Sequence, residues 1–192
     1  MATITATRGK VVQGPSLFQR LFTDVRAAWL WLPLRLWLGY QWIEASSHKL
    51  GNPAWTQTGT ALKGFWTNAV AMPENGRPPI AFGWYRSFIQ ALLDAEAYTW
   101  FAKLIAYGEL LIGIGLIVGA VIGVTAFFAA FMNWNFMMAG SASTNPLLFV
   151  IAIGLLLAWR VAGQVGVDYV IFNRSRVMSR LSTVRRQLSA NH

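Results

Sequence analysis

Residues 103 to 160 read KLIAYGELLIGIGLIVGAVIGVTAFFAAFMNWNFMMAGSASTNPLLFVIAIGLLLAWR, and between the two end residues only Glu109 carries a charge. A helix needs about 20 mostly apolar residues to cross the hydrocarbon core of a bilayer. The stretch is long enough for two or three crossings, so it predicts an integral membrane protein. A carboxylate inside such a stretch is costly, which makes Glu109 a candidate functional residue.

The composition of the whole chain agrees with this prediction. The chain has 192 residues, enough for one domain, and is 55% hydrophobic. Only 12% of its residues are charged, against about 25% in an average soluble protein. A net charge of +9 is typical of nucleic-acid-binding proteins, but here the basic residues gather towards the two ends of the chain. We therefore expect no nucleic-acid partner and an association with membrane lipids.

The chain lacks cysteine and has two histidines, His48 and His192. Without cysteine it has no thiolate ligands for a metal or an iron–sulfur cluster. Because His192 is the last residue, the pair of axial histidines that a haem between helices would need is missing as well. We expect no metal, no haem and no iron–sulfur cluster in this chain.

Hydrophobic segments predict an all-α fold, an integral membrane four-helix bundle. The four expected crossings are residues 27–47, 98–118, 124–140 and 147–166. An even number of crossings places both termini on one side, and both are basic, so the positive-inside rule assigns them to the cytoplasm. The predicted divisions are a basic N-terminal segment (1–26), a transmembrane domain (27–172) whose outward segment (50–99) has short amphipathic helices over 60–72 and 80–97, and a basic tail (173–192).

Several charged side chains fall inside or beside the crossings. Arg35 and Glu109 are each near mid-membrane on antiparallel helices, and pairing them would neutralise both. We expect this ion pair, and a second one between Arg160 and Asp168 towards the inner side. The alternative reading is that these groups only hold helices together through hydrogen bonds.

Polar groups in an aromatic-rich bundle also supply the components of a quinone site. Such a site needs an apolar slot for the ring and tail and a few polar groups for the carbonyl oxygens and their protons. Glu109 and Glu44 are the candidate catalytic residues, since they could exchange protons with a quinol. The candidate ligand-binding residues are Arg35, Asn133, Asn135 and His48. For His48 the alternative is a solvated helix end beside Lys49.

Four motifs together resemble the DoxX/DoxD-like membrane proteins. They are Leu34-Arg35-Leu-Trp-Leu-Gly39 followed by Lys49-Leu50, Tyr107-Gly108-Glu109-Leu110-Leu-Ile-Gly113, residues 135–140 with Asn145-Pro146, and Ala162-Gly163-Gln164-Val-Gly166-Val-Asp168. This resemblance covers the four predicted crossings, about two thirds of the chain. It implies a four-helix bundle in a prokaryotic plasma membrane. Its DoxD branch is the large membrane subunit of thiosulfate:quinone oxidoreductase, which implies a quinone substrate, a small sulfur oxyanion as donor and a partner subunit.

Two functions remain open from the sequence. The first is a quinone-side membrane subunit of an oxidoreductase complex, with electrons passing directly from substrate to quinone or arriving from a partner's cofactor. The second is a non-catalytic anchor or scaffold subunit, whose Trp- and Phe-rich faces pack against other helices of a larger membrane complex.

Overall fold

The described chain is built from helices alone. The computed structural model describes residues 16–170, and no strand occurs among them. The helices are α1 (Ser16–Thr23), the 3-10 helix η1 (Val25–Ala27), α2 (Ala28–Leu50), α3 (Pro53–Thr56), α4 (Thr60–Val70), α5 (Gly83–Asp94), α6 (Tyr98–Val118), α7 (Ile122–Met138), α8 (Asn145–Leu157) and α9 (Trp159–Ala162). The all-α prediction is confirmed for these residues. The basic residues of the two predicted terminal segments before 16 and after 170 lie outside them.

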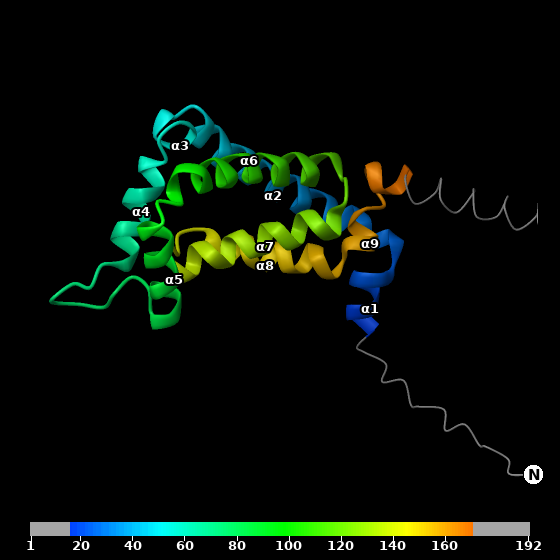
Figure 1. Ribbon diagram of the computed structural model, residues 1–192. Coiled ribbons are helices and arrows are strands. Elements are labelled where there is room, and N and C mark those ends of the chain that lie inside the picture. The colour runs from blue at the N-terminus through cyan, green and yellow to red at the C-terminus, as the bar shows by residue number, and fades with distance from the viewer. Residues whose placement is uncertain (1–15, 171–192) are drawn as a thin grey trace, which may run out of the picture.

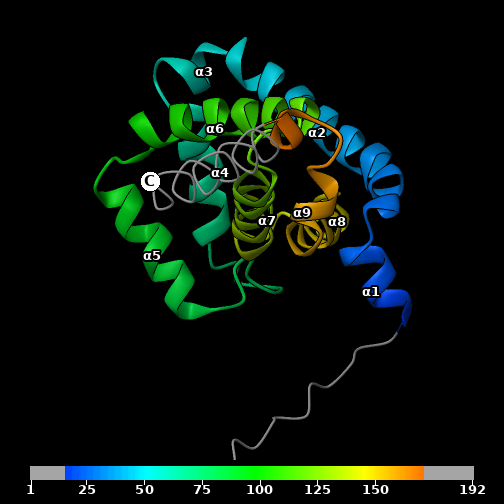
Figure 2. The ribbon, with the colours of Figure 1, turned by 90° about the vertical axis from the view of Figure 1, so that its right-hand side faces the viewer.

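Four long helices form the body of the molecule. Helix α2 packs along α6, and α7 packs along α8, so two helix pairs face each other (Figure 1). In the view of Figure 2, α7 and α8 point towards the viewer and α2 and α6 lie above them. The predicted second crossing coincides with α6, whereas the predicted fourth crossing is interrupted at Ala158, between α8 and α9.

The segment between α2 and α6 covers one end of this body. Helices α3, α4 and α5 gather there, while α1 and α9 lie at the opposite end (Figure 1). The two predicted amphipathic helices are confirmed as α4 and α5. Each has buried residues on one side, among them Leu62 and Trp66 on α4 and Tyr85 and Ile89 on α5, which pack with Ala102 and Ile105 of α6 in one apolar cluster.

Two glycines set the register between α2 and α6. A Cβ added to Gly113 would lie 2.9 Å from the carbonyl oxygen of Gly39 and 2.5 Å from Cγ1 of Ile43. Side-chain-free positions let two helix backbones approach closely. Because the helices are antiparallel, this contact places Arg35 near the end of α6, beside Gly119, and brings the last turn of α2 towards Glu109.

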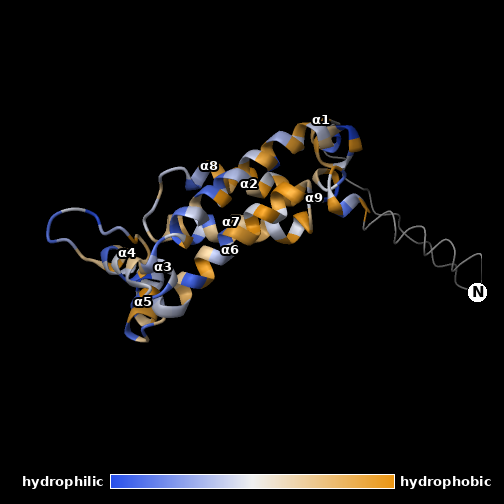
Figure 3. Cartoon of the chain, turned by 90° about the horizontal axis from the view of Figure 1, so that it is seen from above, coloured by the Kyte–Doolittle hydropathy of each residue, from blue (hydrophilic) through white to orange (hydrophobic). Residues whose placement is uncertain are grey.

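Apolar side chains lie outside as well as inside the body. Figure 3 shows hydrophobic residues along the long helices and a hydrophilic loop beyond α4. Within residues 16–170, α6 is the one helix long and apolar enough to cross a membrane, while α7 and α8 are apolar but shorter. Helix α2 is long enough, but it contains Arg35, Glu44, His48 and Lys49.

Candidate functional site

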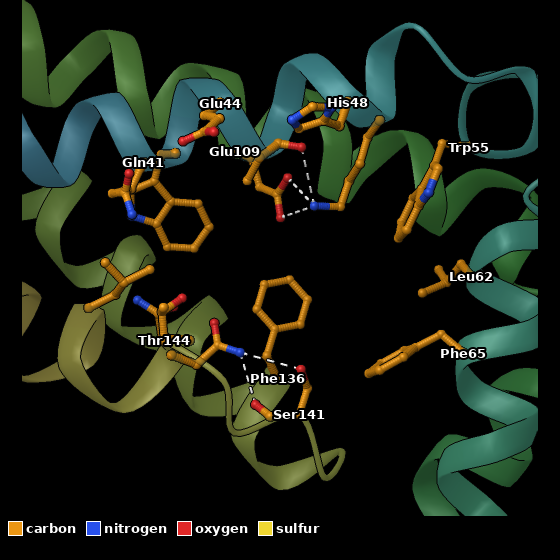
Figure 4. Close-up of a pocket in the computed structure, with 16 residues that line it drawn as sticks. Gln41, Glu44, His48, Trp55, Leu62, Phe65, Glu109, Phe136, Ser141 and Thr144 are labelled. Atoms are coloured by element: carbon orange, nitrogen blue, oxygen red, sulfur yellow. Dashed lines mark hydrogen bonds and ion pairs between the residues drawn. The ribbon is translucent and has the colours of Figure 1, made fainter.

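A polar pocket lies where α2 faces the turn between α7 and α8, with α3 and α4 at one side (Figure 4). Its volume is about 420 Å³. The lining residues come from six helices and the 139–144 turn: Gln41, Trp42, Glu44, Ala45, His48, Lys49, Trp55, Leu62, Phe65, Glu109, Asn133, Phe136, Ser141, Thr144, Asn145 and Leu148. We call it the polar pocket because the buried or half-buried polar side chains of Gln41, Lys49, Glu109 and Asn133 line it.

Glu109 and Lys49 form an ion pair in the wall of this pocket. Lys49 Nζ lies 2.7 Å from Oε2 and 2.9 Å from Oε1 of Glu109. The Glu109 side chain is 1% exposed and that of Lys49 is 19% exposed. Lys49 also lies over the ring of Trp55, with its nitrogen 5.3 Å from the ring centroid. A buried carboxylate thus has a full counter-charge, and the pair joins α2 to α6.

The predicted Arg35–Glu109 ion pair is wrong. Arg35 Nη1 donates instead to the carbonyl oxygen of Ala162 at 2.8 Å, at the other end of the body. The physical reason is the register set by Gly39 and Gly113. It separates the two residues by about ten positions of α6, or roughly 15 Å of helix rise. Arg35 therefore does not belong to the polar pocket.

Asn133 is buried in the pocket with no hydrogen-bond partner. Its side chain is 0% exposed, and both Nδ2 and Oδ1 lack a partner. The indole nitrogen of Trp42, also in the pocket wall, lacks one too. A buried unpaired polar atom costs about 1–3 kcal/mol. A donor and an acceptor on one side chain, together with an indole donor, are therefore left for something that enters the pocket.

Glu44 and His48 line the same pocket but are exposed. They stand four residues apart on α2, so they share one face of that helix. Figure 4 shows both at the rim, on the same helix as Gln41, with Trp55 and Phe65 across the opening. The structure thus brings together Glu44, His48, Glu109 and Asn133 of the predicted site residues.

Asn135 lies in a different place. It stands two positions after Asn133 on α7, which turns it away from the polar pocket, and its polar groups are all paired. Tyr85 donates to Oδ1 of Asn135 at 3.0 Å, and Asn135 Nδ2 donates to the carbonyl oxygen of Phe131 at 2.8 Å. Burial raises the pKa of Tyr85 to about 12, so its hydroxyl stays protonated and remains a donor at neutral pH.

The predicted Arg160–Asp168 ion pair is also wrong. Asp168 accepts from the backbone nitrogens of Val121 at 2.6 Å and Ile122 at 2.9 Å, where α7 begins. Those free N–H groups attract a carboxylate at a helix start. Arg160 is exposed and places its guanidinium 5.1 Å from the ring centroid of Trp159. Asp168 is thus a structural residue that fastens the chain after α9 to the α6–α7 turn.

Lys49 and Trp42 are the functional candidates that sequence reasoning missed. Lys49 reads as a solvated helix end, because the helix-breaking Gly51-Asn52-Pro53 follows one residue later, after Leu50. The signal that could have identified it is the small-residue pair Gly39 and Gly113, which sets the register of α2 against α6. Among residues 16–170, no three His, Cys, Asp or Glu side chains converge as metal ligands would.

Compared with protein-family models, with curated proteins and with solved structures, the chain has no match. The resemblance to DoxX/DoxD-like membrane proteins therefore depends on the sequence motifs alone. In the structure, two glycines of these motifs, Gly39 and Gly113, set the packing of α2 on α6. Two charged residues of the motifs, Glu109 and Lys49, pair in the wall of the polar pocket.

Proposed function

We propose that this chain is the quinone-binding membrane subunit of an oxidoreductase complex, with the quinone head group held in the polar pocket. The observation that carries the proposal is Asn133, fully buried in that pocket with a donor and an acceptor both unpaired. A quinone carbonyl can accept from Nδ2, and a quinol hydroxyl can donate to Oδ1. One amide therefore suits both oxidation states.

The rest of the pocket supplies what quinone chemistry needs. Reduction of a quinone to a quinol adds two electrons and two protons. The Lys49–Glu109 pair can give and take a proton inside the pocket, and the exposed Glu44 and His48 can exchange protons with water at the rim. Trp42 and Phe136 provide apolar walls for a flat ring. The electrons come from a small sulfur oxyanion such as thiosulfate or from a partner subunit.

A membrane location is supported by the outward faces of α6 and α7. Exposed on them are Leu104, Tyr107, Leu111, Ile114, Val118, Val124, Phe127, Phe128, Phe131 and Trp134. A soluble protein seldom leaves so continuous an apolar face uncovered. In this proposal α2, α6, α7 and α8–α9 cross a prokaryotic plasma membrane, both termini are cytoplasmic, and α3–α5 cover the outward end of the bundle.

The direct test is to measure the quinone that stays with the purified protein. Wild-type protein extracted in mild detergent is expected to carry a quinone that mass spectrometry can identify. Asn133→Leu and Glu109→Gln should lose most of it, whereas Glu96→Gln, a change of the same kind at an exposed acid, should keep it. Wild-type protein without quinone, and with none taken up from added menaquinone or ubiquinone, would contradict the proposal.

The same preparation tests the scaffold alternative. The exposed aromatic faces could contact a partner's helices instead of lipid. A complex of fixed stoichiometry that is unchanged by Asn133→Leu and carries no quinone would favour the anchor or scaffold function.

A further inference from the structure

The described residues form two further hollows besides the polar pocket. One is a groove of about 400 Å³ between α6 and α7, lined by Phe101, Leu104, Ile105, Gly108, Leu111, Ile112, Val124, Thr125, Phe128, Phe131 and Met132. The other is a pocket of about 160 Å³ beneath α4 and α5, which we call the aromatic pocket. The groove lies on the exposed apolar side of the bundle, since Leu104, Leu111 and Phe128 are all exposed.

The aromatic pocket shares lining residues with both the groove and the polar pocket. The groove and the aromatic pocket have Phe101, Ile105, Phe131 and Met132 in common. The aromatic pocket and the polar pocket share Leu62, Phe65 and Phe136. The side chains of Met132 and Phe136 therefore stand at the two junctions between neighbouring hollows. A methionine is unbranched and adapts its shape readily, which suits such a place.

The unpaired polar groups of the lining increase from the groove, through the aromatic pocket, to the polar pocket. In the groove the one polar side chain is Thr125, whose hydroxyl already donates to backbone carbonyls of the α6–α7 turn. In the aromatic pocket the polar side chains of Tyr85 and Asn135 bond to each other. Unpaired buried donors and acceptors remain in the polar pocket, on Asn133 and Trp42. A molecule that fits the whole series has a polar head and a long apolar tail.

We infer that the three hollows form a lateral route, in which the head group sits in the polar pocket and the apolar tail runs through the aromatic pocket to the lipid-facing groove between α6 and α7. This inference rests on the proposed quinone site and adds its tail path. The occupant is an isoprenoid quinone from the membrane phase. The route lets it enter from the bilayer.

Gly108 keeps the groove open next to the first junction. A Cβ added there would meet one atom within 4 Å, the sulfur of Met132, at 3.9 Å. A small side chain therefore fits at this position, whereas a large one would occupy the groove. Gly108 is adjacent to Glu109 in sequence, but it lines the groove on the other side of α6.

The test compares quinones with and without a tail. Binding of menaquinone and its tail-free analogue menadione, and of decylubiquinone and its tail-free benzoquinone, is followed by tryptophan fluorescence in detergent. The groove variants are Gly108→Phe and Leu111→Trp. The matched controls are Gly108→Ala and Ile114→Trp; Ile114 is exposed on the same helix but does not line the groove. Leu111 is 68% exposed, so its replacement does not disturb the core if Gly108→Phe fails to fold.

We expect the groove variants to weaken binding of the tailed quinones by about tenfold, through lost burial of the tail. Tail-free quinones should bind to groove variants, controls and wild type alike. If tailed quinones bind every variant as they bind wild type, the route is overturned while the head-group site stands. If the wild type binds neither tailed nor tail-free quinone, the proposed function itself is overturned, and the route with it.

Discussion

Lys49 Nζ sits 2.7 Å from Oε2 of Glu109, so the last turn of α2 is tied to the middle of α6 by an ion pair that is almost fully buried on its acidic side. Attraction between buried charges has to offset the loss of hydration of both. The Lys49–Glu109 contact therefore has two effects. It neutralises a carboxylate within an apolar helix, and it places a proton-carrying pair in the same pocket as the unpaired amide of Asn133.

Replacing one member of the Lys49–Glu109 pair should lower the free energy of unfolding more than replacing both. Lys49→Met leaves the Glu109 carboxylate buried without a counter-charge, and we expect a loss of about 3–5 kcal/mol in the free energy of unfolding. The double variant Lys49→Met with Glu109→Leu should recover most of that loss. Thermal unfolding in detergent measures both. Lys103→Met, at an exposed lysine of α6, is the control and should change stability little. Equal losses of unfolding free energy for the single and double variants would contradict the proposed pairing.

The Gly39–Gly113 contact should tolerate no added methyl group. Gly113→Ala would place a Cβ 2.5 Å from Cγ1 of Ile43 and 2.9 Å from the Gly39 carbonyl oxygen. Pushing α2 off α6 should cost about 1–3 kcal/mol and should also lower quinone binding, because it shifts Lys49 relative to Glu109. Gly64→Ala on α4 meets nothing within 4 Å and should stabilise by roughly 0.5–1 kcal/mol. Equal unfolding temperatures for the two variants would refute the proposed role of this contact.

Asp168 should matter for stability and not for ligand binding. Asp168→Asn keeps the shape but removes the charge that faces the start of α7, and we expect a loss of about 1–3 kcal/mol. Quinone affinity per folded molecule should stay at the wild-type level, since Asp168 is not among the residues lining the polar pocket. Asp94→Asn, at an exposed acid, should leave both unchanged. A selective loss of binding in Asp168→Asn would place this residue in the site after all.

Tyr85 should ionise late in an alkaline titration. Burial disfavours the charged tyrosinate and raises the pKa of Tyr85 from 10.0 to about 12. The folded state therefore holds this proton more tightly than the unfolded state does. Its contribution to stability is full below pH 10 and is lost as the pH rises towards 12. The tyrosinate absorbance of Tyr85→Phe, subtracted from that of wild type, should isolate one late transition; a difference curve centred near the ordinary tyrosine value would be inconsistent with burial.

The proposed topology makes opposite predictions for two reporter positions. Alkaline phosphatase folds to its active form outside the cytoplasm. Inserted at Asn75, in the loop between α4 and α5, it should be active, and fused after His192 it should be inactive. Green fluorescent protein at the same two positions should give the opposite pattern. Equal activity at both positions would place them on the same side of the membrane and contradict the proposed topology.

Most of the helices could be predicted from the hydrophobic pattern of their own residues. The apolar run with its single carboxylate predicted α6 with the bounds observed, because a helix of that composition needs only its own residues to be recognised. Thr60 and Gly83 begin the two amphipathic helices close to where their periodicity predicts. The break at Ala158 was not predicted, since α8 and α9 form one uninterrupted apolar pattern in the sequence.

The candidate site was predicted in part. Glu44, His48, Glu109 and Asn133 do line one pocket, because polar residues within apolar helices gather away from the hydrophobic surface. Asn135, predicted as part of the same group, lines the aromatic pocket instead. It is only two positions from Asn133, but successive positions on a helix point about 100° apart, so the two amides face different hollows.

By itself, the sequence determined the helical class, the apolar segments and the short set of polar side chains from which any site must be built. Only the tertiary structure decided which of those side chains meet. The depth of a residue along its own helix is a local count, and by that count Arg35 and Glu109 were well matched. Register between helices depends on where two backbones come closest, here at Gly39 and Gly113, and this contact pairs Glu109 with Lys49 and sends Arg35 to the opposite end.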